Sequence, residues 1–227
     1  MMELIRDGFV IAGKDLRKEW KTKETISVML IFSALVVLVF SFAFDPANQT
    51  VKTVIPGLVW LITIFSALLG LNRSFASELE NGCLNGLRAA PIDPASIYIG
   101  KVIANFVLVL FVQMVSIPVL FILFDYRFAG SLLWFLATVF LGTYGLIIVV
   151  TFLAALAVNA KNSEMLLPVL LLPLLSPLMI GAVQASAAFA GGENMESAMS
   201  WIQLMAGYDL LFTAVCLLLF EYILEDS

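Results

Sequence analysis

The stretch Val102–Phe124, VIANFVLVLFVQMVSIPVLFILF, contains no charged residue. An α-helix needs roughly 20 apolar residues to cross a hydrocarbon core of about 30 Å, so this stretch is long enough to span a bilayer. Blocks of similar character recur along the chain at Ile26–Phe44, Ile55–Leu71, Leu132–Val158, Leu166–Phe189 and Ala206–Leu224. The sequence therefore predicts an all-α integral membrane protein in which six transmembrane helices form a single domain over residues 1–227.

The composition supports this interpretation. Hydrophobic residues make up 62% of the chain and charged residues 13%, about half the charged content of an average soluble protein. The net charge of −5 says little about partners in such a chain, because the position of the charges matters more than their sum. No nucleic-acid partner is expected.

Basic residues are distributed unequally between the two sides of the predicted bundle. One side carries ten: Arg6, Lys14, Arg17, Lys18, Lys21, Lys23, Arg73, Arg88, Lys101 and Lys161. The other side carries Lys52 and Arg127. Because cytoplasmic segments of membrane proteins carry the excess of Lys and Arg, we expect both termini in the cytoplasm.

Residues 1–24 have the pattern of an amphipathic elbow helix lying on the membrane surface. An apolar stripe recurs at helical spacing, with basic residues mostly off the stripe. The stripe consists of Ile5, Phe9, Ala12, Leu16 and Trp20. The alternative is a simple basic anchor that orients the first span.

The longest polar connection, residues 72–101, has a pattern of its own. The second span continues through Phe75 to Leu79 and meets a helix stop at Asn81-Gly82. Cys83–Ala90 can form a short helix that docks into another protein, or an ordinary loop helix. Asp93-Pro94 reads as an N-cap followed by proline in the first helical turn.

The fifth and sixth blocks are also unusual. Pro168, Pro173 and Pro177 crowd the fifth span, and each removes a backbone hydrogen-bond donor. The segment Met195–Leu204 precedes the sixth block. It can be a short helix that dips into the outer leaflet or a plain exposed loop.

Several absences narrow the chemistry. With the sixth span placed at 206–224, Asp209 falls near a membrane boundary, and no charged residue is expected near the middle of any span. Ion-coupled carriers use such groups, so secondary transport is disfavoured. The chain lacks a GxxxxGK[ST] motif and has no histidine, and no catalytic residue or metal site is expected. The isolated chain is therefore not expected to be an enzyme.

A six-helix membrane subunit without a motor suits the permease of an ATP-driven transporter whose nucleotide-binding subunit is a separate chain. Since six spans make half of the usual twelve-helix pathway, two copies of the chain are expected.

Several motifs resemble one family. The segment Ile55–Trp60 (IPGLVW), then Ser66–Leu69 (SALL), then Arg73 and Phe75, is similar to the second span of haem exporter protein B (CcmB). The next segment, Phe75–Leu87 (FASELENGCLNGL), resembles the cytoplasmic motif of that family, with Glu78 where the family pattern has Asp. Pro91 and Lys101 also fall where the family has them. The motifs are confined to about 55–101, while the similarity in length and span number covers the whole chain.

The resemblance implies a fold of the ABC-2 exporter type, with an elbow helix at 1–24 and a cytoplasmic coupling helix within 72–101. It also implies the bacterial inner membrane and a cytochrome c biogenesis complex. The implied partners are a soluble ATPase subunit, a multi-span haem-handling protein, a small single-span subunit and a periplasmic haem chaperone. Haem would then be handled by the complex and ATP bound by the partner, with no cofactor assigned to this chain.

Carried over by position, the candidate contacts with the ATPase are Phe75, Glu78, Gly82, Leu84 and Leu87, and the motif residues of the second span are Pro56, Gly57 and Trp60. Glu78 can instead be a solvated carboxylate at a helix end, and Gly82 an ordinary helix cap. The implied activity couples ATP hydrolysis to haem export or to release of the loaded chaperone. An interior without charge or histidine slightly favours release, since a haem pathway would need groups that hold the propionates. The alternatives are an ABC-2 permease for a polysaccharide, lipid or drug, and a non-transporting scaffold of the complex.

Overall fold

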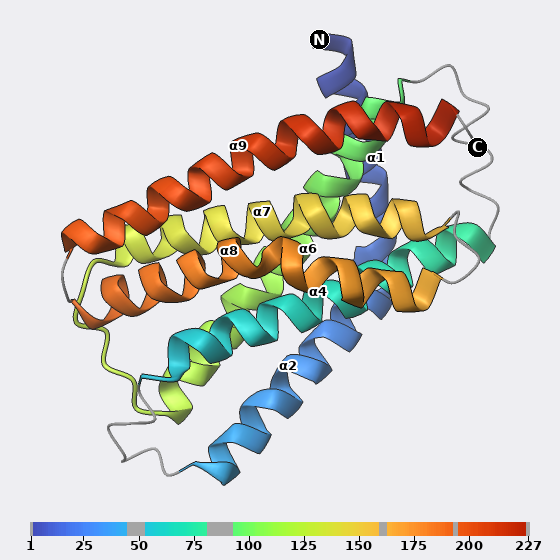
Figure 1. Ribbon diagram of the computed structural model, residues 1–227. Helices are drawn as coiled ribbons and strands as arrows, with labels where there is room; N and C mark the ends of the chain where they lie inside the picture. The colour runs from blue at the N-terminus through green and yellow to red at the C-terminus, as the bar shows by residue number, and fades with distance from the viewer. Residues whose placement is uncertain (1, 45–52, 81–92, 159–162, 193–194, 226–227) are drawn as a thin grey trace.

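The computed structural model describes residues 2–44, 53–80, 93–158, 163–192 and 195–225. Within these ranges the chain forms seven α-helices: α1 (Met2–Thr22), α2 (Glu24–Ala43), α4 (Ile55–Glu80), α6 (Pro94–Leu123), α7 (Leu132–Val158), α8 (Ser163–Gly191) and α9 (Met195–Glu225). Figure 1 shows them gathered in one bundle, with α1 crossing the others steeply.

Five of the described helices, α2, α6, α7, α8 and α9, are long and apolar enough to cross a membrane. In α4 the corresponding apolar stretch is the shorter Ile55–Leu71. The prediction of an all-α, multi-pass membrane protein is confirmed, while a sixth crossing by α4 stays a prediction.

The helices differ in how much of their surface lies inside the bundle. In an 18-residue window of the α7 span, 72% of the residues are buried, against 28% in the corresponding windows of α2 and α9. Large apolar side chains cover the outside, including Phe42, Leu133 and Leu210. An apolar surface of this extent is unfavourable in water and suits contact with acyl chains.

The last helix differs from the sequence-based prediction. Met195–Leu204 is neither a separate dipping helix nor a loop but the start of α9. Helix formation here has a packing reason, because Ala198, Ile202 and Met205 recur at helical spacing and are all buried in the bundle.

This longer helix corrects the predicted position of Asp209. The residue stands near the middle of the spanning stretch Ala198–Phe220 and is 4% exposed, so the expectation of no mid-span charge was wrong. The argument against ion-coupled transport rested on the absence of a charged residue near the middle of a span, and Asp209 removes that argument.

The start of α6 confirms the predicted cap. Asp93 has an extended backbone, its Oδ1 accepts a hydrogen bond from the Ala95 amide at 2.9 Å, and Pro94 occupies the first turn. The helix therefore begins eight residues before the apolar block Val102–Phe124, because the cap and not the hydropathy sets its start.

The proline-rich block forms one continuous helix, α8. Because Pro177 has no amide hydrogen, the Pro173 carbonyl lacks its intrahelical donor, and the Ser176 hydroxyl donates to that carbonyl at 2.9 Å. The helix ends at Gly191, and the next residue, Gly192, has a φ of +77°, the left-handed value that favours glycine.

Two connections meet at the same end of the bundle. The Ala129 amide, between α6 and α7, donates to the Ala190 carbonyl near the end of α8 at 3.0 Å. At Gly130 an added Cβ would lie 1.9 Å from the Phe189 carbonyl oxygen, so only glycine fits this approach. The α6–α7 and α8–α9 connections thus share one side, as an alternating up-and-down path requires.

Candidate functional site

Helix α4 contains both sets of residues that the sequence singles out. Pro56, Gly57 and Trp60 lie in its first two turns, and Phe75 and Glu78 near its end. Pro56 is buried in the first turn, where a missing amide hydrogen costs nothing. A Cβ added at Gly57 would meet no atom within 4 Å, so local packing does not require a glycine at this position.

Trp60 joins three helices. Its side chain is 1% exposed, and its indole Nε1 donates to the Ser186 Oγ of α8 at 2.9 Å. The ring also lies directly over Gly142 of α7, where an added Cβ would come within 2.2 Å of the ring. The motif tryptophan is therefore a core residue that fixes α4 against α7 and α8.

A buried polar chain lies one turn further along α4. The Gln113 side-chain amide of α6 donates to the Thr63 hydroxyl at 2.8 Å and accepts from the Thr143 hydroxyl of α7 at 2.9 Å. The Thr63 hydroxyl in turn donates to the Val59 carbonyl at 2.8 Å. Each hydroxyl proton has an acceptor, and the chain of hydrogen bonds ties α4 to α6 and α7.

The other end of α4 extends past its apolar stretch. The helix continues for nine residues beyond Leu71, about 13 Å at the usual rise of a helix. Phe75 and Glu78 lie on this extension, as predicted. Gly82, Leu84 and Leu87, with the predicted short helix Cys83–Ala90, lie outside the described residues.

Helix α1 packs against the start of α6. An added Cβ at Gly100 would lie 2.8 Å from the Ile11 side chain and 2.9 Å from the Gly8 carbonyl oxygen, so the two backbones approach closely. Beside this crossing, Lys101 Nζ pairs with Asp15 Oδ2 at 3.0 Å, and both side chains are largely buried. Lys101, noted in the sequence as a family position, thus attaches α1 to the bundle.

The face that α1 buries differs in part from the predicted stripe. Ala12 is buried as expected, but Phe9 and Trp20 are 60% and 61% exposed. Gly8 and Ile11 are buried instead. The stripe was read from apolarity alone, whereas the close approach of α1 to α6 places Gly8, Ile11 and Ala12 against α6 and leaves Phe9 and Trp20 largely exposed.

A sharp elbow separates α1 from α2. Lys23 has a φ of +55°, and the Glu19 carboxylate accepts hydrogen bonds from the amides of Thr25 and Ile26 at 2.6 and 2.9 Å. A carboxylate at this position accepts hydrogen bonds from amides that have no partner within the helix. It also interacts favourably with the positive end of the α2 dipole.

The sequence interpretation missed the polar residues that join the helices. A signal was available for Gln113, which interrupts an otherwise apolar block and must find a partner in the membrane. Ser186 and Thr143 carried no such signal, because small hydroxyl side chains can bond to their own helix.

Comparison with known proteins agrees with this picture. The profile of the CcmB protein family matches residues 7–223. Heme exporter protein B of Rhodobacter capsulatus is 31% identical over 170 residues, covering 75% of this chain and 78% of the relative. The protein of the same name from Paracoccus denitrificans is 28% identical over 189 residues, covering 83% and 86%. That from Pseudomonas aeruginosa is 31% identical over 180 residues, covering 78% and 80%. Because the family profile extends over nearly the entire chain, this membrane bundle belongs to the CcmB family.

Proposed function

We propose that the chain is the transmembrane subunit of an ABC transporter that acts in cytochrome c biogenesis. It would couple ATP hydrolysis by a partner subunit to haem export or to release of a haem-loaded periplasmic chaperone. The observation that carries this proposal is the family match over residues 7–223, together with relatives that bear the name heme exporter protein B.

The proposed coupling route runs along α4. One end of this helix leads into the segment that holds Gly82, Leu84 and Leu87, and Phe75 and Glu78 precede it. Trp60 and Thr63, further along the same helix, bond to α8 and α6. Movement of the cytoplasmic end by an ATPase would therefore act on the neighbouring helices together, because rigid elements with fixed contacts transmit displacement.

The proposed arrangement in the membrane and the proposed partners are those that membership of the CcmB family implies. We propose six crossings, both termini in the cytoplasm of a bacterial cell, and α1 as an elbow helix at the inner membrane. The partners would be a soluble ATPase, a multi-span haem-handling protein, a small single-span subunit and a periplasmic haem chaperone, with two copies of this chain.

Asp209 does not alter the preference between haem passage and chaperone release. Release is slightly favoured because a haem pathway would need groups that hold the haem propionates, and the chain has no histidine to do so. A buried carboxyl group such as Asp209 repels a propionate rather than holding it, so both routes remain part of the proposal.

Substitutions in the coupling segment test the proposal. Glu78→Ala and Gly82→Leu are expected to abolish cytochrome c maturation, measured by covalent haem staining, while leaving the amount of the protein in the membrane unchanged. Glu80→Ala is the matched control, since it makes the same change two residues away and is expected to mature cytochromes normally. Normal staining in both test variants would exclude this segment as the coupling element.

Two further experiments separate the alternative functions. Deletion of the gene is expected to eliminate c-type cytochromes; their persistence would favour a permease for a polysaccharide, lipid or drug. An inactivated ATPase partner is expected to block maturation, whereas maturation without ATP hydrolysis would favour the scaffold.

A further inference from the structure

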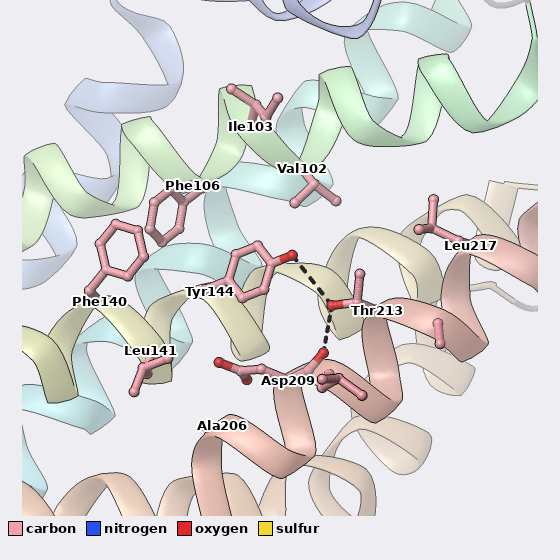
Figure 2. Close-up of a pocket in the computed structure, with 12 residues that line it drawn as sticks. Val102, Ile103, Phe106, Phe140, Leu141, Tyr144, Ala206, Asp209, Thr213 and Leu217 are labelled. Carbon is pink, nitrogen blue, oxygen red and sulfur yellow. Dashed lines mark hydrogen bonds between the residues drawn. The ribbon is translucent and has the colours of Figure 1, made fainter. Parts of the chain in front are cut away.

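A pocket of about 820 Å³ lies between α6, α7 and α9 (Figure 2). Its volume falls within the range of small-molecule sites. Most of its lining is apolar, and three aromatic rings contribute: Phe106, Phe140 and Tyr144. Phe106 contacts the other two rings edge-on, at centroid distances of 4.9 and 6.0 Å.

Asp209 lines this pocket, and among the residues that the structure describes neither of its carboxylate oxygens has a hydrogen-bond partner. The residue is 4% exposed and both oxygens are closed off from solvent, so a ligand reaches them only when the side chain turns from Gly145 toward the pocket. The carboxyl group rests against Gly145 of α7, where an added Cβ would come within 2.1 Å of Oδ1. An ionised carboxyl group is costly to bury without a partner, and a cationic donor on a ligand would supply that partner.

The hydrogen bonds around Asp209 define what such a ligand must offer. The Thr213 hydroxyl donates to the Asp209 backbone carbonyl at 2.5 Å, which commits its only proton. In the 3.3 Å contact between Tyr144 and Thr213 (Figure 2), the tyrosine hydroxyl must therefore be the donor. The capacity left over, on the Tyr144 oxygen and the Asp209 carboxylate, is for accepting hydrogen bonds.

We propose that this pocket binds an amphiphile with an apolar body and a protonated amine. The amine would donate to the Asp209 carboxylate and the Tyr144 oxygen, and the aromatic rings would face its positive charge. The apolar body would fill the remainder of the pocket, which is lined by residues such as Leu141 and Val102.

The position of the site favours a free amine over a lipid headgroup. Asp209 lies about 21 Å along α9 from Met195, near the middle of the spanning stretch. Headgroups stay at the membrane surface, whereas an amphiphile dissolved in the bilayer can reach this depth. Exposed lining residues, Leu210 at 76% and Phe140 at 54%, indicate that the pocket opens to the outside of the bundle.

The first test compares two probes on the unmodified full chain in phosphatidylcholine nanodiscs. One probe is a dodecyl chain with a dansyl group at one end and a primary amine at the other; the second is its N-acetylated form. We expect the amine to bind at least about tenfold more tightly, because a hydrogen bond to a charged group is involved. Equal affinities would overturn the proposal, whatever the variants do.

Variants then locate the site. Asp209→Asn is expected to lose the preference for the amine, and Tyr144→Phe to reduce it in part while keeping the ring. Asp125→Asn makes the same change in the exposed turn after α6 and is expected to leave the preference unchanged. A preference retained by folded Asp209→Asn would contradict the assignment.

Two outcomes would assign the pocket to another occupant. Replacement of half the lipid by phosphatidylethanolamine is expected to leave probe affinity unchanged; a clear loss would identify the lipid headgroup as the occupant and overturn the free-amine assignment. Loss of a co-purifying membrane protein from Asp209→Asn, with probe binding intact, would make the pocket a protein interface. The test measures binding alone, so it is independent of the proposed role in cytochrome c biogenesis.

Discussion

Trp60 of α4 packs directly on the backbone of Gly142 in α7, with the indole ring where the glycine Cβ would be. Gly142→Ala should lower the free energy of unfolding by about 1–3 kcal/mol, because the buried ring cannot move without breaking its bond to Ser186. Thermal unfolding of the purified protein in detergent should show this as a loss of several degrees.

Gly207→Ala is the matched control for that substitution. Gly207 also lies inside a spanning helix, but an added Cβ there meets no atom within 4 Å. The alanine should be neutral or slightly stabilising. Equal losses in the two variants would mean that the cost comes from the helix backbone and not from contact with Trp60.

The sequence identified several single residues but not their partners. Trp60 stood out as part of a motif, and Asp93 as a cap. Ser186, the partner of Trp60, is 126 positions away in the chain, and no local pattern predicts such a contact. Asp209 was placed wrongly because its depth depends on where α9 begins, and helix boundaries inside amphipathic segments are hard to set from hydropathy.

The attachment of α1 to α6 is the clearest property at the scale of elements. Lys101 and Asp15 form a largely buried ion pair between them. Lys101→Met should leave the Asp15 carboxylate without its buried partner, at a cost of about 3 kcal/mol. We expect α1 to detach more readily, measured as faster trypsin cleavage after the exposed Arg17.

Two comparisons make this test specific. Lys14 pairs with the same carboxylate at 3.3 Å but is half-exposed, so Lys14→Met should change the cleavage rate little. Asp15→Leu combined with Lys101→Met should restore much of the protection, since both charges are then absent. A double variant cleaved as fast as Lys101→Met alone would show that close helix packing, not charge, determines the attachment.

The positions of the helices were easier to predict than the face of each helix that is buried. Long apolar blocks predicted five of the helices, because a segment that crosses the membrane must form its backbone hydrogen bonds within itself. The buried face of α1 was only partly foreseen. Asp15 lies on that face, where it pairs with Lys101 of α6. The sequence alone gives no reason to place a carboxylate toward α6.

At the scale of the whole molecule, the position of α4 inside the bundle was beyond prediction, because hydropathy does not say which apolar block packs against the most neighbours. It packs against α2, α6, α7 and α8. Residues along its length, Ile55, Ile62 and Leu71, are almost fully buried. Its apolar stretch is shorter than those of the five spanning helices, yet the helix has 26 residues and is about 39 Å long. A helix of that length can cross a core of about 30 Å.

Reporter fusions decide whether α4 crosses, because one crossing more or less inverts every later segment. With the N-terminus in the cytoplasm, confirmed by a fluorescent N-terminal green fluorescent protein, six crossings place Arg127 outside after the third and Ser227 inside after the sixth. We therefore expect alkaline phosphatase to be active when fused after Arg127 and inactive when fused after Ser227. If α4 does not cross, both activities reverse together. A reversal at one site alone would instead indicate a disturbed fusion, since parity links the two positions.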